Sequence, residues 1–309
     1  MKNPTLIIIC GPTATGKTEV AFDVAKKLKT EIISFDSVQI YKELDIGAAK
    51  PSLEFRQEIP HHLIDEVNPD QLFTAGDFRK QALDEIAKLS EKKYIVLVGG
   101  TGFYLQALIK GMYEIPSIDP QIKINLIEES KLKGMDSLYA ELVKKDPAYA
   151  KRIHPNDSYR ILRGLEVLRS GSKSLTKMRE EFKSAPLPNK IVQIGLRRKK
   201  EILRQVVESR TECMIASGLI EETSQLLKKY PQGIRPLESV GYKEAVKFIS
   251  GELTQGELLP TIVTHTLQLA KRQYTWFKRD PAIKWFDPDE MGVDPIVEGI
   301  VRLSLDNSS

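Results

Sequence analysis

The chain has 309 residues, of which 41% are hydrophobic and 28% charged, and its formal net charge is +4. This length corresponds to about two domains, and the composition excludes collagen-like, disordered and coiled-coil proteins. Apolar runs such as Leu6–Cys10 are far shorter than the ~20 residues of a membrane helix and lack the flanks of a signal peptide. We therefore expect a cytoplasmic protein without a membrane segment.

Cysteine and histidine are both scarce. The two cysteines, Cys10 and Cys213, are too few for a disulfide framework, and the four histidines lack zinc-ligand spacing. We expect both thiols to be buried and reduced. His61 and His62 are expected to pack at the start of a strand and to take no part in catalysis.

Positive charge is concentrated in the middle of the chain. Residues 151–210 contain 16 Lys and Arg against 6 Asp and Glu, a local charge of +10, whereas residues 1–115 contain 14 against 16. A polyanion is one partner for such a segment. A solvated helical face is the alternative.

Strands and helices alternate in the first third of the chain. Short β-rich apolar runs lie at 5–10, 31–34, 62–65 and 94–98, and helical patterns lie at 17–28, 74–90 and 102–110. This alternation predicts an α/β fold with a parallel sheet covered by helices on both faces.

Residues 116–190 break the alternation, because they contain helical patterns and no strand pattern. The helical patterns lie at 120–133, 137–145 and 157–170. A strand at 191–196 returns the chain to the sheet, and further helices follow at 199–216, 220–229, 241–250 and 254–279. We predict a catalytic core made by residues 1–115 and 191–309, with an inserted all-helical domain at 116–190.

A glycine-rich motif lies between the first predicted strand and helix. Residues 11–18, GPTATGKT, match the phosphate-binding pattern GxxxxGK[ST] in the required context. Its backbone N–H groups can converge on phosphate oxygens, a lysine adds charge and the last hydroxyl can hold Mg²⁺. The expected diphosphate-binding residues are Gly11, Thr13, Ala14, Thr15, Gly16, Lys17 and Thr18, with Thr18 at the metal. The motif alone leaves kinase, NTPase and diphosphate-displacing transferase open.

Further motifs follow in a fixed order. They are DSVQIY at 36–41, DIGAAKP at 45–51, PHHLID at 60–65, VGGTGFY at 98–104, Asn156-Asp157 with Arg160 and Arg163, VGY at 240–242, and LAKRQYTWF at 269–277. With the phosphate loop, this series resembles the bacterial tRNA dimethylallyltransferases, also called tRNA isopentenyltransferases, from Thr5 to about Phe286. The resemblance implies a P-loop sheet domain that carries a helical insertion.

The resemblance also implies a reaction. A dimethylallyl group would pass from its diphosphate to N6 of the adenosine immediately 3′ of the anticodon, in tRNAs that read codons beginning with U. Breaking the allylic C–O bond leaves charge on diphosphate, which the loop amides, Lys17 and Mg²⁺ at Thr18 would stabilise. Because adenine N6 is a poor nucleophile, a carboxylate that accepts its proton helps, and Asp36 is the candidate.

Four residues are expected to be catalytic: Asp36, Thr101, Lys17 and Arg210. By resemblance, Thr101 lies beside the reacting groups and Arg210 contacts the diphosphate. The alternative for Asp36 is a helix cap or a residue that supports a metal site. Residues 99–102 can be a tight turn, and Arg210 can lie on a helix surface.

The target adenine must leave its stack to react, at a cost of a few kcal/mol, and contacts to the RNA must offset that cost. The resemblance assigns these contacts to three stretches and the pocket itself. They are Lys123, Tyr159, Arg160, Ile161, Leu162 and Arg163; Val240, Gly241, Tyr242 and Lys243; Lys271, Arg272, Gln273, Trp276 and Lys278; and Asp36, Ser37, Val38, Gln39 and Thr101.

Helical spacing partly supports the contacts assigned to residues 271–278. Arg272, Trp276 and Arg279 recur on one helical face, although Trp276 can instead belong to the core. Two positions, Ala48 and Leu267, depart from the Thr and Arg usual in the family. Lys123 also replaces an Arg, which keeps the charge but loses the bidentate fork.

Two other functions remain open at this stage. The chain can be a small-molecule or nucleoside kinase, with the basic segment closing over ATP phosphates, or a P-loop RNA-binding protein without turnover. We expect a monomer, because no long apolar heptad pattern is present.

Overall fold

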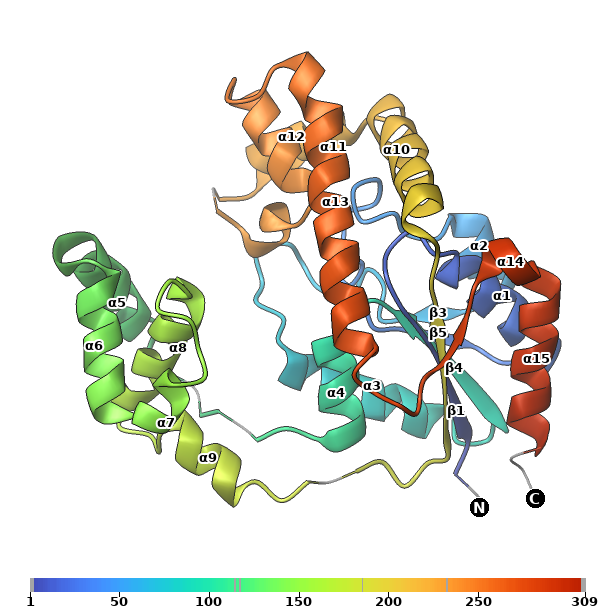
Figure 1. Ribbon diagram of the computed structural model, residues 1–309, viewed down its shortest axis with the longest axis horizontal. Helices are drawn as coiled ribbons and strands as arrows, with labels where there is room; N and C mark the ends of the chain where they lie inside the picture. Colours follow the sequence, from blue (N-terminus) through green and yellow to red (C-terminus); the bar gives the residue numbers. More distant parts are fainter. Residues whose placement is uncertain (1–2, 114, 117, 185, 232, 307–309) are drawn as a thin grey trace. The chain divides into compact units, whose positions relative to one another are not determined.

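The structure, a computed structural model, describes residues 3–113, 115–116, 118–184, 186–231 and 233–306 (Figure 1). By its internal contacts the chain divides into a core unit, Met1–Ile109 with Leu187–Ser309, and a helical unit, Lys110–Pro186. The insertion expected at 116–190 therefore begins six residues earlier and ends four residues earlier. The N–H of Leu187 donates to the carbonyl of Ile109 at 3.3 Å, so the chain leaves and re-enters the core unit at neighbouring points.

A parallel sheet forms the centre of the core unit. Within the described residues its strands are β1 (Thr5–Cys10), β2 (Ile32–Ser34), β3 (His61–His62), β4 (Tyr94–Gly99), β5 (Ile191–Leu196) and β6 (Lys284–Phe286). Their order is β3-β2-β4-β1-β5-β6, and each neighbouring pair is parallel. Strands β1 and β4 are buried throughout, which explains their nearly continuous apolar sequences.

Helices cover this sheet. The core unit contains α1 (Lys17–Leu28), α2 (Leu53–Glu58), α3 (Ala75–Lys88), α4 (Gly102–Lys110), α10 (Lys200–Ala216), α11 (Leu219–Lys229), α12 (Tyr242–Ile249), α13 (Gln255–Phe277), α14 (Pro288–Met291) and α15 (Val293–Asp306). A 3₁₀ turn, η1, spans Arg235–Glu238. Helices α1 and α15 share one apolar cluster with the sheet, in which Ile7 and Ile9 meet Val24 and Ile300.

The helical unit has a core of its own. It contains α5 (Pro120–Lys133), α6 (Met135–Lys145), α7 (Pro147–Ala150), α8 (Ser158–Arg169) and α9 (Leu175–Glu181). Leu126, Leu142 and Leu165 are among its fully buried side chains. Arg169 on α8 bonds Glu129 of α5 at 2.6 Å and Glu141 of α6 at 2.5 Å, so an ion-pair network also links these helices.

Several sequence expectations change here. Helices α2, α7, α9, α14 and α15 and strand β6 are additions, and the strand expected at 62–65 is the two-residue β3. Cys10 is buried, and burial raises the pKa of its thiol to about 12, but Cys213 is exposed, so the expectation of two buried thiols is wrong. None of the helices described is long and apolar enough to cross a membrane.

Candidate active site

Three neighbouring strands bring the predicted catalytic groups together. Strands β1, β2 and β4 are adjacent and parallel, with Cys10 opposite Gly99 and Ser34 opposite Val98. The phosphate loop follows β1, Asp36 follows β2 and Thr101 follows β4. Because parallel strands share one carboxyl edge, the three segments meet there, where α/β proteins usually bind ligands.

Two glycines are required by the shape of the phosphate loop. Gly11 has φ +137°, and a Cβ at this position would lie 2.4 Å from the carbonyl oxygen of Leu196 on β5. Gly16, with φ +84°, directly precedes α1. The Thr15 hydroxyl closes the loop by donating to the Pro12 carbonyl at 2.9 Å. The loop therefore ends at the N-terminus of α1, a favourable position for a bound phosphate.

Lys17, Asp36 and Arg210 share one electrostatic environment. Burial lowers the pKa of Lys17 to about 8, while Asp36 raises it and Arg210 lowers it. Burial also lowers the pKa of Arg210, and Asp36 opposes that shift. Lys17 Nζ donates to the Pro12 carbonyl at 2.5 Å. Arg210 is half-buried, and its charge interacts with those of Lys17 and Asp36, so it is not a fully solvated helix-surface residue.

Asp36 has a structural role as well as a favourable position. Its Oδ1 accepts the N–H groups of Val38 at 2.9 Å and Gln39 at 3.3 Å. Its Oδ2 has no hydrogen-bond partner among the residues described. The Thr101 hydroxyl accepts the N–H of Ser37 at 3.1 Å and donates to the Ser37 hydroxyl at 3.3 Å. The turn after β4 thus holds the loop after β2 in place.

Gln273 on α13 bridges two loops, a role that the sequence did not reveal. Its Oε1 accepts the N–H of Thr13 at 2.8 Å, and its Nε2 donates to the Gly100 carbonyl at 3.1 Å. A Cβ on Gly100 would lie 2.4 Å from Nε2, so the bridge requires glycine there. The Thr13 N–H, expected at the diphosphate, is therefore bonded to protein, and the Gln273 side chain, expected at tRNA, faces the loops.

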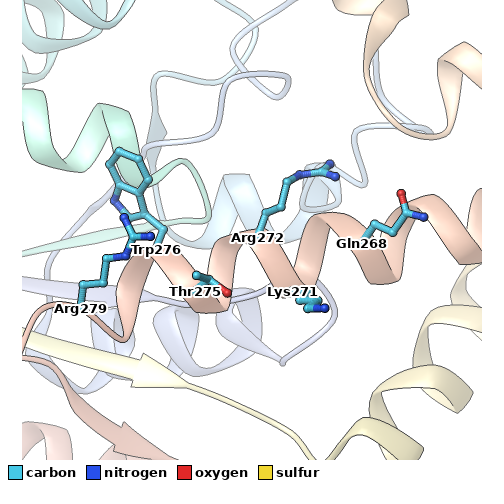
Figure 2. A pocket seen from close by; sticks show the side chains of 6 residues that line it. All are labelled: Gln268, Lys271, Arg272, Thr275, Trp276 and Arg279. Carbon is cyan, nitrogen blue, oxygen red and sulfur yellow. The ribbon is translucent and has the colours of Figure 1, made fainter. Parts of the chain in front are cut away.

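Basic and aromatic side chains line a groove along α13 (Figure 2). Its volume is about 440 Å³, and it is lined by Gln268, Lys271, Arg272, Thr275, Trp276 and Arg279. Trp276 is 40% exposed, and a Cβ on Gly102 would lie 2.2 Å from its indole ring. Trp276 thus packs against the chain at the start of α4 while it keeps an exposed surface, so assignment to the core is wrong.

The stretch around residue 240 differs from expectation. Tyr242 is fully buried, and Gly241 is buried with its N–H bonded to Glu244 at 2.7 Å. The burial of Tyr242 contradicts a tRNA contact by its side chain. Val240 is half-buried, whereas Lys243 is exposed and pairs with Glu238 at 3.2 Å.

The residues predicted to contact tRNA from the helical unit also include both buried and exposed side chains. Ile161 is fully buried in the unit's core and Leu162 packs against it, so a tRNA contact by Ile161 is contradicted. Lys123 and Tyr159 are exposed. Arg160 pairs with Asp157 at 2.7 Å and Arg163 with Glu166 at 2.8 Å.

The departure at Leu267 has a local explanation, whereas nothing in the structure explains the one at Ala48. Leu267 packs against the small apolar cluster of Ala14, Val207 and Val263, so its side chain supports the phosphate loop. Ala48 contributes its backbone carbonyl, which accepts a hydrogen bond from Gln39 at 3.3 Å.

Both histidines of β3 are engaged in local packing, as expected. His61 Nδ1 donates to the Ile59 carbonyl at 2.7 Å, and burial lowers the pKa of this imidazole. His62 lies between Glu31 at 2.7 Å and Glu85 at 3.1 Å.

These features define a P-loop α/β protein whose phosphate loop is joined to a basic, aromatic groove and whose sheet carries an inserted helical unit. Residues 39–280 match the IPP transferase family, and the chain belongs to this family. The tRNA dimethylallyltransferase 2 of Syntrophus aciditrophicus is 41% identical over 290 residues, 93% of each chain. The tRNA dimethylallyltransferase of Synechocystis is 40% identical over 304 residues, 98% of each chain.

Solved structures agree with this assignment. The crystal structure of a tRNA isopentenylpyrophosphate transferase from Staphylococcus epidermidis has a TM-score of 0.71 and 33% identity, with 99% of this chain and 100% of that chain covered. A eukaryotic dimethylallyltransferase acting on tRNA has a TM-score of 0.76 and 27% identity, with 92% of this chain and 74% of that chain covered.

Proposed function

We propose that this enzyme transfers a dimethylallyl group from dimethylallyl diphosphate to N6 of the adenosine immediately 3′ of the anticodon, in tRNAs that read codons beginning with U, and releases diphosphate. Prenyl transfer to tRNA is the activity for which its relatives are named. The observation that carries the proposal is the Gln273 bridge, which ties the phosphate loop to a groove lined by cations and an indole ring. The enzyme acts in the cytoplasm as a monomer.

The phosphate loop would bind the leaving group. As the allylic C–O bond breaks, negative charge grows on the diphosphate and positive charge on the allyl carbons. Donors already aimed at the phosphates favour that change. The N–H groups of Ala14 to Thr18, the Lys17 ammonium and the Arg210 guanidinium are the groups placed to supply them.

Asp36 would remove the proton. Oδ1 is fixed by two backbone N–H groups, which leaves Oδ2 to accept a proton from N6 as the new C–N bond forms. Thr101 holds the same loop through Ser37, so the acceptor is positioned before the purine arrives.

The groove on α13 would bind the RNA next to the extruded base. An exposed indole such as that of Trp276 can stack on a nucleotide, a contact worth ~1–3 kcal/mol per base. The exposed Lys271, Arg272 and Lys278 suit phosphate groups. In the helical unit, the exposed Lys123, Tyr159 and Arg160 would contact the anticodon stem-loop.

A magnesium ion is a proposed cofactor, and the residues present fit one particular kind of site. The described residues include no group of three or more His, Cys, Asp or Glu that could hold a metal, which argues against a resident ion. Mg²⁺ is commonly bound by substrate phosphates, waters and one or two side chains, and the half-buried Thr18 hydroxyl is the protein ligand we assign. When bound, Mg²⁺ neutralises charge on the diphosphate.

Incubation of the purified enzyme with labelled dimethylallyl diphosphate, Mg²⁺ and unmodified tRNA tests this proposal. We expect label on the RNA, at the adenosine beside the anticodon. Transfer of γ-phosphate from ATP instead would indicate a kinase. Binding of tRNA without either reaction would indicate an RNA-binding protein, and both of these results would overturn the proposal.

A further inference from the structure

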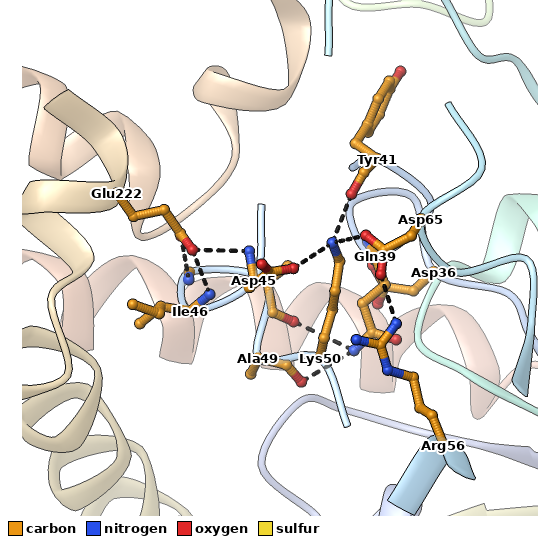
Figure 3. Close-up of polar contacts among 12 residues, drawn as sticks. Asp36, Gln39, Tyr41, Asp45, Ile46, Ala49, Lys50, Arg56, Asp65 and Glu222 are labelled. Atoms are coloured by element: carbon orange, nitrogen blue, oxygen red, sulfur yellow. Dashed lines mark hydrogen bonds and ion pairs between the residues drawn. The ribbon is translucent and has the colours of Figure 1, made fainter. Parts of the chain in front are cut away.

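One carboxylate holds a turn that lies far from it in sequence. Glu222 on α11 accepts three consecutive backbone N–H groups, those of Asp45 at 3.0 Å, Ile46 at 2.9 Å and Gly47 at 3.2 Å. It also accepts the Tyr242 hydroxyl at 2.5 Å. Figure 3 shows the Glu222 side chain directed at the turn. A single side chain therefore fixes the backbone of residues 45–47, the anchored turn.

The anchored turn also packs tightly against the ring of Tyr242. A Cβ on Gly47 would lie 2.5 Å from the ring of Tyr242, which is fully buried. Burial and the Glu222 carboxylate both raise the pKa of Tyr242, so its hydroxyl stays protonated and donates to Glu222. Glu222 and Tyr242 together leave the turn little room to shift.

The position of this turn determines how Gln39 is oriented. Gln39 Nε2 donates to the carbonyls of Ala48 at 3.3 Å and Ala49 at 3.2 Å, the two residues after the anchored turn. With Nε2 directed at the turn, Oε1 accepts a hydrogen bond from the Ser34 hydroxyl at 3.3 Å and keeps a second lone pair for another donor. An acceptor held in this way favours a base that presents an amino group, as adenine does.

The same loop has a second anchor that belongs to its own segment. Lys50, whose side chain is 2% exposed, pairs with Asp45 at 2.7 Å and with Asp65, and it also donates to the Tyr41 carbonyl at 2.7 Å. Arg56 completes the network by pairing with Asp65 at 2.5 Å (Figure 3). Lys50 therefore ties the segment to itself, whereas Glu222 ties it to α11.

We propose that Glu222 is a positioning residue for purine recognition. By holding the anchored turn, it fixes the carbonyls that orient Gln39, whose own N–H is bonded to Asp36 at 3.3 Å. This inference rests on the proposed function. It places Glu222 outside the chemical step and outside prenyl diphosphate binding, so its loss should affect the RNA substrate selectively.

The test compares Glu222→Gln with Glu221→Gln, a matched control on an exposed neighbour of the same helix. A glutamine keeps one acceptor oxygen but turns an NH₂ group toward N–H donors. Loss of a hydrogen bond to a charged group corresponds to about tenfold in affinity. We expect Glu222→Gln to raise KM for an anticodon stem-loop about tenfold and to leave KM for dimethylallyl diphosphate unchanged. Amide hydrogen exchange at residues 45–47 should be faster.

Two further comparisons separate positioning from general damage. Tyr242→Phe keeps the three backbone hydrogen bonds to Glu222, so we expect a smaller rise in KM for RNA. If Glu222→Gln raised both KM values equally and lowered thermal stability, its role would be merely structural and the inference would be overturned. The inference would also be overturned if Glu222→Gln behaved like Glu221→Gln. If the wild-type enzyme transfers no prenyl group to RNA, the proposed function itself fails.

Discussion

The Oε1 atom of Gln273 lies 2.8 Å from the backbone nitrogen of Thr13 and accepts its hydrogen bond. Gln273 is flanked on α13 by Arg272, which lines the groove, while Thr13 belongs to the phosphate loop. The helix that carries the groove residues is therefore hydrogen-bonded to the phosphate loop through one side chain. A displacement of α13 on RNA binding would be transmitted to the phosphate loop through this bond.

The first prediction follows from this bond. Gln273→Leu keeps the approximate volume but leaves the Thr13 N–H and the Gly100 carbonyl without their partner, at ~1–3 kcal/mol for each group that stays buried. We expect KM for the prenyl diphosphate to rise about tenfold or more in steady-state kinetics. Gln268→Leu, on the groove side of the same helix, should leave it unchanged. Equal effects of the two substitutions would disprove the role of the bridge.

A second prediction concerns the contact between Gly102 and Trp276. A methyl group on Gly102 would lie 2.2 Å from the indole, so Gly102→Ala must displace the ring, and overpacking of this kind costs ~1–3 kcal/mol. Urea unfolding should show this loss of stability, and RNA affinity should fall. Gly256→Ala, with open space around the new methyl group, should leave both unchanged or raise stability by up to about 1 kcal/mol.

The third prediction separates the two roles of Asp36. Asparagine at this position retains an oxygen for the N–H groups of Val38 and Gln39 but cannot take up a proton. Asp36→Asn should therefore keep tRNA binding and lower turnover by ~100-fold or more. Asp36→Ala, which also removes the loop bonds, should weaken tRNA binding as well. Turnover of Asp36→Asn close to that of the wild type would remove Asp36 from the mechanism.

The fourth prediction concerns the basic residues of α8. Arg160 pairs with Asp157 at the cap of α8, and Arg163 pairs with Glu166 on the same helix. The Arg160 pair is largely exposed, and exposed pairs are weak, so a phosphate group can replace Asp157. Glu166 is buried, so Arg163 would have to meet phosphate while it keeps that partner. Replacing both arginines with Gln should weaken tRNA binding and reduce the log–log salt slope by roughly 0.7–0.9 per contact. Filter binding at several salt concentrations measures both the affinity for tRNA and the salt slope. An unchanged slope, as expected for Lys26→Gln on α1, would show that neither arginine meets phosphate.

A fifth prediction uses the pKa of Lys17, which burial lowers to about 8. Only the protonated ammonium attracts diphosphate. Because the group loses its proton as the pH rises through 8, KM for the prenyl diphosphate should be flat below that pH and rise about tenfold per unit above it. Lys17→Arg carries a guanidinium with a pKa above ~12 and should abolish the break. Identical pH profiles for the two proteins would assign the break to another group.

Local sequence determined much of this site. The phosphate loop was predictable because its glycines, lysine and hydroxyl lie within eight residues, between a strand and a helix that are themselves apparent from their patterns. Asp36 could be placed near the end of a predicted strand, whereas the role of Thr101 was predictable only from the family resemblance. Both follow strands of one parallel sheet, and parallel strands end at one edge.

Contacts between distant segments were not predictable in this way. Tyr242 shares the polarity of a surface tyrosine, and only its position beneath Gly47 shows that it is buried. The partners of Gln273 lie 260 and 173 residues away, and no periodicity in the helix indicates them. Strand β6 has only three residues, too few for a pattern. It is recognised by its parallel pairing with β5.

The hydrogen bond between Leu187 and Ile109 has an evolutionary consequence. Where a chain departs and returns at adjacent points, the intervening segment can grow, shrink or be exchanged without stretching the scaffold that carries it. Selection can therefore alter the helical unit while the sheet and the phosphate loop stay intact, and lineages of this family can diverge in one module at a time.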